Sequence, residues 1–130
     1  MRRAIALARA RAGQTAPNPA VGCVIVSGGA IVAEAATAPR GRPHAEEQAL
    51  ATIGGATGAV AYVTLEPCGL RSSGEPSCAE RLIAARVVRV VYARDNPDAR
   101  SAGKGPARLR AAGVAVESGL LANEAEGLGA

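Results

Sequence analysis

Aromatic residues are almost absent from this chain, which contains no Phe, no Trp and two Tyr, Tyr62 and Tyr92. Proteins that bind single-stranded nucleic acid usually stack the bases on aromatic rings. The net charge of +4 comes from arginines that are scattered along the chain and form no dense basic run. A nucleic-acid substrate is therefore disfavoured, whereas a phosphorylated small molecule is compatible with the positive charge.

Long apolar runs and cysteines are also scarce. No apolar stretch reaches the roughly 18 residues needed to cross a bilayer, and arginines interrupt the opening segment "MRRAIALARARAGQ", so neither a membrane span nor a secretion signal is expected. Three cysteines are too few, and odd in number, for a secreted disulfide framework. We expect a cytoplasmic protein whose 130 residues form one domain, 1–130.

Helical and strand-like patterns alternate along the chain. A helix is expected over residues 2–12, with Ile5, Ala8 and Ala12 on one face. Two strands within 21–36 are expected to form a hairpin at Ser27-Gly28-Gly29. The later pattern predicts helices over 44–53, 78–86 and 105–113, strands over 59–65, 87–93 and 114–119, and a final helix within 120–130. This order predicts an α/β fold, a three-layer α/β/α sandwich with a mixed sheet that is parallel in its second half.

The only histidine, His44, stands two residues before Glu46 in "PHAEEQAL". Taken alone, a histidine near a helix start, such as His44, is more often an ordinary polar residue than a metal ligand. Cys68 and Cys78 flank a nine-residue loop that follows the strand expected over 59–65. Cys78 begins a predicted helix, whose N-terminal N–H groups favour thiolate over thiol.

One imidazole and two thiolates together form a donor set for Zn²⁺. Such a set leaves the fourth tetrahedral position open to water, which is typical of a catalytic zinc site. Glu46 is close enough along the chain to His44 to act as a general acid and base without joining the ligands. Cys23 lies in an apolar strand, where a cysteine usually packs as a small hydrophobe, so we expect it in the core.

Zinc deaminases that act on cytosine or adenine carry an H-x-E motif followed by P-C-x-x-C. His44-Ala45-Glu46 matches the first part, while nine residues and not two separate the cysteines. Over nearly its whole length the chain resembles the deaminase domain of the bifunctional riboflavin-biosynthesis deaminase/reductase, a family with a longer loop between the cysteines. The resemblance rests on "PNPAVGCVIV", "PHAEEQAL", "AYVTLEPC", "PSC", "RVVRVVYA" and "LRAAGVAVESGLLANEA". It implies a cytidine-deaminase-like fold.

The resemblance also implies hydrolytic loss of an exocyclic amine from a diaminopyrimidinone that carries a ribosylamino 5′-phosphate. Zn²⁺ would be the cofactor and Glu46 the catalytic proton carrier. His44, Cys68 and Cys78 would be the metal ligands, and the substrate would be bound by Asn18, the Ala45 backbone N–H, Arg71 and Asp98.

Several of these positions have a second interpretation. Asn18 stands between two prolines, where turn residues are common. Arg71 is the only cation in the loop between the cysteines, and the segment 96–98 reads "NPD" where the family has "DPN". We interpret Glu66 as a structural hydrogen-bonding residue near the site.

Two alternative functions stay open at this point. One is a zinc deaminase of another nucleobase or nucleoside, and the other is a zinc-binding subunit without turnover. Glu46 argues against the latter, because an idle site needs no proton carrier. The resemblance further implies a homodimer or homotetramer, a small-molecule pyrimidine substrate, and a reductase that is either fused or separate.

Overall fold

The computed structural model describes residues 1–15, 19–39, 42–69, 76–97 and 102–125. Their elements, in chain order, are α1 (Arg2–Arg9), β1 (Gly22–Ser27), β2 (Ala30–Ala36), α2 (Ala45–Ala51), β3 (Val60–Leu65), α3 (Cys78–Ala84), β4 (Arg89–Arg94), α4 (Lys104–Ala111) and β5 (Ala115–Ser118). The strands form one sheet in the order β2-β1-β3-β4-β5. β1 is antiparallel to β2 and to β3, while β3, β4 and β5 are parallel, so the predicted mixed sheet is confirmed.

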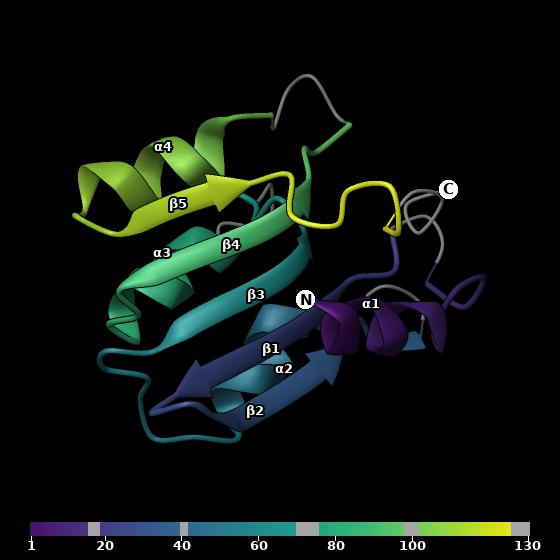
Figure 1. The fold of residues 1–130 in the computed structure, drawn as a ribbon, viewed down its shortest axis with the longest axis horizontal. Coiled ribbons are helices and arrows are strands. Elements are labelled where there is room, and N and C mark those ends of the chain that lie inside the picture. Colours follow the sequence, from purple (N-terminus) through teal and green to yellow (C-terminus); the bar gives the residue numbers. More distant parts are fainter. Residues whose placement is uncertain (16–18, 40–41, 70–75, 98–101, 126–130) are drawn as a thin grey trace.

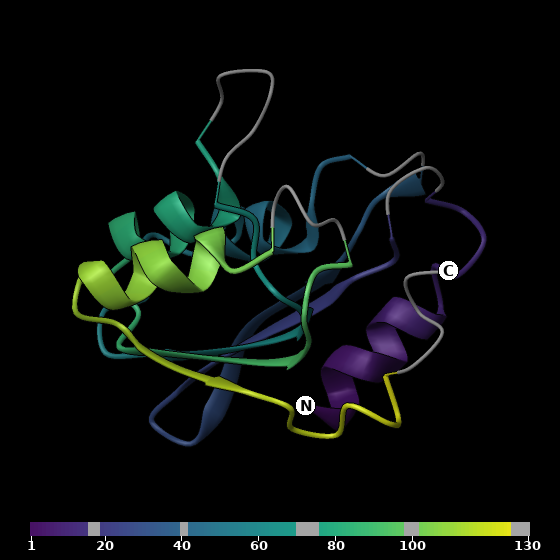
Figure 2. The same ribbon diagram turned by 90° about the horizontal axis from the view of Figure 1, so that it is seen from above.

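Helices cover both faces of this sheet. α2, α3 and α4 lie on one face, and α1 lies on the other (Figure 1), an arrangement that the view from above makes plain (Figure 2). The predicted three-layer α/β/α sandwich is therefore confirmed. Among the helices of the described residues, none combines the length and the hydrophobicity of a membrane span.

The core follows the strand periodicity, because alternate side chains of a strand point to the same face. Ile25 of β1, Val63 of β3 and Val90 of β4 are fully buried against Leu82 of α3 and Leu109 of α4. Cys23 belongs to the same cluster and is also fully buried, which confirms its assignment to the core.

The predicted hairpin is present and has the expected turn chemistry. β1 and β2 are joined by Gly28 and Gly29, which have φ of +59° and +81°. Two successive positive φ angles match the right-handed twist of paired strands and strongly favour glycine. The turn pairs Ser27 with Ala30 and Val26 with Ile31, and an irregularity between Ile25 and Val26 shifts the pairing of the remaining residues by one.

The first helix differs from its prediction. It ends at Arg9 and continues as turns, and its buried residues are Ala4, Ile5 and Ala8. Ala12, expected on this face, is exposed. The N–H groups of Arg11 and Ala12 bond to carbonyls three residues back, so the last turn is tighter than an α-helix and Ala12 no longer lies on the buried face.

The end of the chain differs as well. Residues 120–125 form turns and not the expected helix, and the rest of that segment lies outside the described residues. Leu121 has a φ of +56°, which a right-handed helix excludes. Leu121 and Ala125 pack against Ile5 and Ala8 of α1. This segment therefore adds to the layer that α1 forms on its face of the sheet, without being a helix.

We predict that Gly22→Ala destabilises the fold. The added Cβ would overlap the carbonyl oxygen of Ala4 and lie 3.1 Å from the backbone nitrogen of Ala8, so α1 would have to move away from β1. The expected loss in the free energy of unfolding is about 1–3 kcal/mol, the usual cost of overpacking. Urea denaturation measures it. Gly54→Ala is the matched control because its Cβ would meet no atom within 4 Å; equal midpoints for the two variants would contradict the prediction.

Candidate metal centre and the cavity beside it

His44 is positioned by the start of α2. It is the residue that precedes the helix, with an extended backbone at φ −68° and ψ 159°. Its backbone N–H donates to Oε1 of Glu47 at 3.3 Å, and its carbonyl accepts from the N–H of Gln48 at 3.1 Å. A side-chain acceptor three residues into the helix and the first helical hydrogen bond thus fix the backbone that carries the imidazole.

Cys68 lies in the loop after β3 and is bound to the first turn of α3. Its Sγ accepts the N–H of Cys78 at 3.2 Å, and its carbonyl accepts the N–H of Ala79 at 3.0 Å. Cys78 is the first residue of α3, and the Oγ of Ser77 caps that helix by accepting the N–H of Glu80 at 3.1 Å. Both thiols are therefore placed by one helix start.

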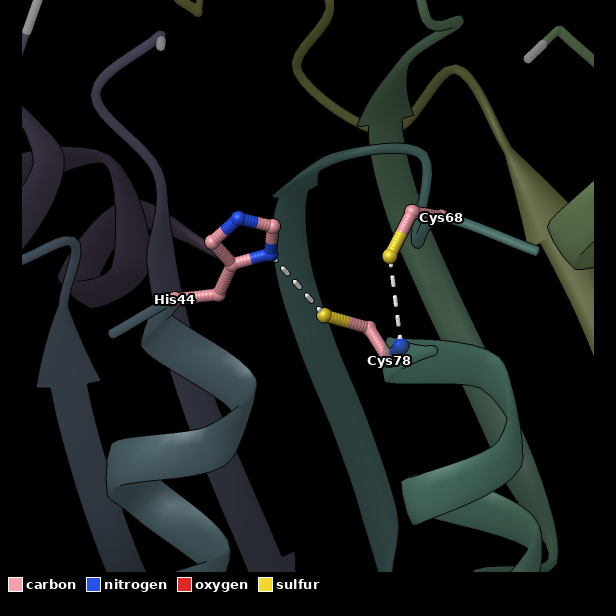
Figure 3. A group of neighbouring side chains, drawn as sticks. All are labelled: His44, Cys68 and Cys78. Atoms are coloured by element: carbon pink, nitrogen blue, oxygen red, sulfur yellow. Dashed lines mark hydrogen bonds between the residues drawn. The ribbon is translucent and has the colours of Figure 1, made fainter. Parts of the chain in front are cut away.

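The three side chains point toward one another, each from a different segment (Figure 3). Nδ1 of His44 lies 3.4 Å from Sγ of Cys78, and the imidazole nitrogen and both sulfurs all lie within 4.8 Å of one another. Hydrogen bonding to Cys78, opposed by burial and aided by His44, lowers the pKa of Cys68 to about 4. Cys68 is thus a thiolate at neutral pH, the form that binds metals.

This donor set fits zinc. In a tetrahedral site with Zn–S near 2.3 Å and Zn–N near 2.0 Å, ligand atoms stand about 3.5–3.8 Å apart, so the separations here need only small side-chain rotations. Thiolates and imidazole also suit zinc better than Mg²⁺ or Ca²⁺, which prefer oxygen ligands. Cys23 is not part of this group, and its burial in the sheet raises its thiol pKa well above the ordinary value.

A cavity of about 60 Å³ opens beside the three side chains. His44, Glu46, Cys68, Glu66 and Asn96 contribute to its wall. One water molecule needs about 10–15 Å³, so the cavity has room for several waters beside the candidate metal ligands. Polar groups and space for water are both requirements of a hydrolytic site.

Glu46 brings a buried carboxyl group to this cavity. It is the second residue of α2 and only 4% exposed. Burial, together with the negative charge of Cys68, raises the pKa of Glu46 above its usual range, although His44 opposes the shift. A carboxyl group whose pKa is raised exchanges protons near neutral pH more readily than an exposed one.

The other residues singled out in the sequence have different outcomes. Ala45, which stands between His44 and Glu46 in the sequence, is the first residue of α2 and is fully buried. Asn18, Arg71 and Asp98 lie outside the described residues.

Sequence reasoning missed Thr37, whose side chain lines the cavity while its Oγ1 accepts the N–H of Val21 at 2.9 Å. Its only signal in the sequence is a polar residue directly after the apolar stretch that forms β2. Glu66 was expected to form structural hydrogen bonds near the site, and its Oε2 indeed accepts the N–H of Gly103 at 2.8 Å.

Most of the chain matches a known family of zinc enzymes. Residues 1–94 match the model of the cytidine and deoxycytidylate deaminase zinc-binding region. The chain belongs to this family. Zinc is accordingly the cofactor, in agreement with the nitrogen and sulfur donors described above.

Relatives within the deaminase family share both sequence and fold with the chain. The riboflavin biosynthesis protein RibD of Escherichia coli (strain K12) is 49% identical over 129 residues, which are 98% of this chain and 35% of the relative. The diaminohydroxyphosphoribosylamino-pyrimidine deaminase of Buchnera aphidicola subsp. Acyrthosiphon pisum is 42% identical over 97% of this chain and 86% of its own length.

A solved structure extends the likeness to three dimensions. The diaminohydroxyphosphoribosylaminopyrimidine deaminase/5-amino-6-(5-phosphoribosylamino)uracil reductase of Thermotoga maritima has a TM-score of 0.91 and 36% identity, over 99% of this chain and 38% of its own. The chain therefore spans about a third of the length of the RibD relative and of this structure.

We predict that Cys68→Ala abolishes stable zinc binding, because one imidazole and one thiol do not hold zinc against competition by water and buffer. The protein is purified with zinc, passed through a desalting column with a mild chelator, and its metal content is measured by mass spectrometry. Cys23→Ala is the matched control, since it removes a thiol from the core and not from the group. Full zinc occupancy in Cys68→Ala, or equal loss in both variants, would contradict the prediction.

Proposed function

We propose that the chain is a zinc-dependent hydrolytic deaminase of a diaminopyrimidinone that carries a ribosylamino 5′-phosphate, an activity of riboflavin biosynthesis. The observation that carries the proposal is the buried carboxyl group of Glu46 in one cavity with His44 and Cys68. The substrate class is the one named for the Buchnera relative, and the pathway is the one named for the Escherichia coli relative.

His44, Cys68 and Cys78 are the zinc ligands in this proposal, supported by their mutual distances and by the thiolate character of Cys68. When bound, zinc supplies a Lewis acid that lowers the pKa of a coordinated water to about 7. The protein contributes the orientation of the donors through the two helix starts. The buried position of Cys78, which is 1% exposed, keeps bulk solvent away from one side of the centre.

Glu46 moves the protons of the reaction. Its carboxylate oxygen accepts a proton from the attacking water as the new C–O bond forms at the ring carbon that bears the amine. The same carboxyl group passes this proton to the ring nitrogen, then takes the proton of the new hydroxyl group and donates it to the departing amine, so the C–N bond breaks and ammonia leaves. One water is consumed and one amine becomes a carbonyl, which balances the hydrolysis.

Residues at the start of α2 and at the cavity wall are the proposed substrate contacts. In this proposal the backbone N–H of Ala45, at the first position of α2, contacts the ring, since first-turn N–H groups have no acceptor within their helix. Asn96, at the cavity wall, joins the residues that orient the substrate. Asn18, Arg71 and Asp98 stay predictions from the sequence, with Arg71 as the phosphate contact.

The partners of the chain are part of the same proposal. A reductase, named together with the deaminase for the Thermotoga protein, is expected to use the product, whether fused or separate. Assembly as a homodimer or homotetramer and a cytoplasmic location stay predictions.

The test is ammonia release from the diaminopyrimidinone ribosylamino 5′-phosphate, with zinc content measured in the same preparations. Wild type is expected to turn over the substrate. Glu46→Gln is expected to keep its zinc and lose about 10²–10⁴-fold in kcat, because glutamine cannot exchange the proton. Glu34→Gln is the matched control: this glutamate lies on β2, where it pairs with Arg3, and its variant should retain full activity.

Two outcomes would count against the proposal in different ways. Undiminished activity in zinc-loaded Glu46→Gln would reject Glu46 as the proton carrier. A zinc-loaded wild type that deaminates cytidine or deoxycytidylate, and not the ribosylamino phosphate, would reject the substrate while keeping the chemistry.

A further inference from the structure

The cavity contains a second buried carboxyl group that the mechanism does not use. Glu66 is 4% exposed and lines the same cavity as Glu46 and Asn96. It directly follows β3 and stands two residues before Cys68. Burying a carboxyl group without hydrogen-bond partners destabilises the fold. The partners of Glu66 therefore indicate its role.

Glu66 binds both ends of the connection between β4 and α4. Its backbone N–H donates to the carbonyl of Arg94, the last residue of β4, at 2.8 Å. Its Oε2 accepts the N–H of Gly103, the residue that precedes α4, at 2.8 Å. Asn96, which also contributes to the cavity wall, lies in the connection between these two points.

The start of α4 packs closely against the segment that carries Cys68. A Cβ at Gly105, in the first turn of α4, would overlap the carbonyl oxygen of Pro67, and one at Gly69 would lie 2.6 Å from the carbonyl carbon of Lys104. The start of α4 thus lies directly against the backbone on either side of Cys68. Gly103 has a φ of +81°, which lets the chain turn into α4 while its N–H faces Glu66.

We propose that Glu66 is a positioning residue, which binds the N–H of Gly103 and thereby fixes the start of α4 beside the wall of the substrate cavity to which Asn96 contributes. The proposal rests on the proposed deaminase function. Since the contact requires an acceptor and no proton exchange, a glutamine oxygen can replace the carboxylate oxygen. This requirement separates Glu66 from Glu46, for which glutamine is inactivating.

The experiment compares zinc-loaded Glu66→Gln and Glu66→Ala with wild type. Zinc content, kcat and KM for the diaminopyrimidinone ribosylamino 5′-phosphate, and hydrogen exchange at the Gly103 amide are measured. Glu66→Gln is expected to retain zinc, wild-type kinetics and the protection of Gly103. Glu66→Ala is expected to retain zinc, lose about 10-fold in Gly103 protection, and raise KM by about 10-fold with a smaller change in kcat, as loss of a hydrogen bond implies.

Glu117→Ala is the matched control, because it removes a glutamate that pairs with Arg89 on the exposed side of β5. It should change neither KM nor the exchange of Gly103. A zinc-loaded Glu66→Gln that loses kcat as Glu46→Gln does would overturn the proposal by making Glu66 a proton carrier. Unchanged exchange or unchanged KM in Glu66→Ala would overturn it as well.

Failure of the proposed function is distinguishable from failure of this inference. If wild type does not deaminate the substrate, the function is wrong, and the Gly103 amide still reports on the contact. Unaltered protection in Glu66→Ala would then reject the positioning role by itself.

Discussion

The site depends on the way in which Cys68 is bound to the first turn of α3. Cys68 belongs to no helix or strand, yet its sulfur and its carbonyl accept the consecutive N–H groups of Cys78 and Ala79. The first N–H groups of a helix have no acceptor within the helix, so the loop satisfies donors that would otherwise need water. These two bonds hold two thiols, ten positions apart in the chain, side by side. Packing of α2 against α3 then adds the imidazole of His44.

Small side chains make this close packing possible. Ala45 and Ala49 of α2 and Ala79 of α3 are fully buried in the main core cluster, where larger residues would hold the helices farther from the sheet. Because small side chains allow the helices to lie close to the sheet, the core can be well packed with almost no aromatic residues. Glycines extend it to backbone contacts, since Gly22 meets α1 and Gly105 meets the segment beside Cys68.

The sequence was most informative where local pattern decides the outcome. Apolar runs and the Ser27-Gly28-Gly29 turn predicted the strands and their hairpin. His44 and Cys78 at predicted helix starts, with Cys68 after a predicted strand, indicated one shared group. It was least informative where distant segments meet. No local pattern marks Thr37 as part of the cavity, because its position there follows from strand order.

Tertiary contacts also decided the remaining differences. The bond from Gly103 to Glu66 joins residues 37 positions apart and depends on α4 lying beside the end of β3. The turns over residues 120–125 replace an expected helix because Leu121 adopts a positive φ and packs with Ala125 on α1. Helix propensity predicts neither the Gly103–Glu66 bond nor the turns over residues 120–125, because tertiary packing routinely overrides it.

Zinc is expected to be held by one imidazole and two thiolates, with one position open to solvent. X-ray absorption at the zinc edge of the loaded protein tests this coordination most directly. Two sulfur neighbours near 2.3 Å and two nitrogen or oxygen neighbours near 2.0 Å are expected. A shell of four sulfurs, or one without sulfur, would contradict it.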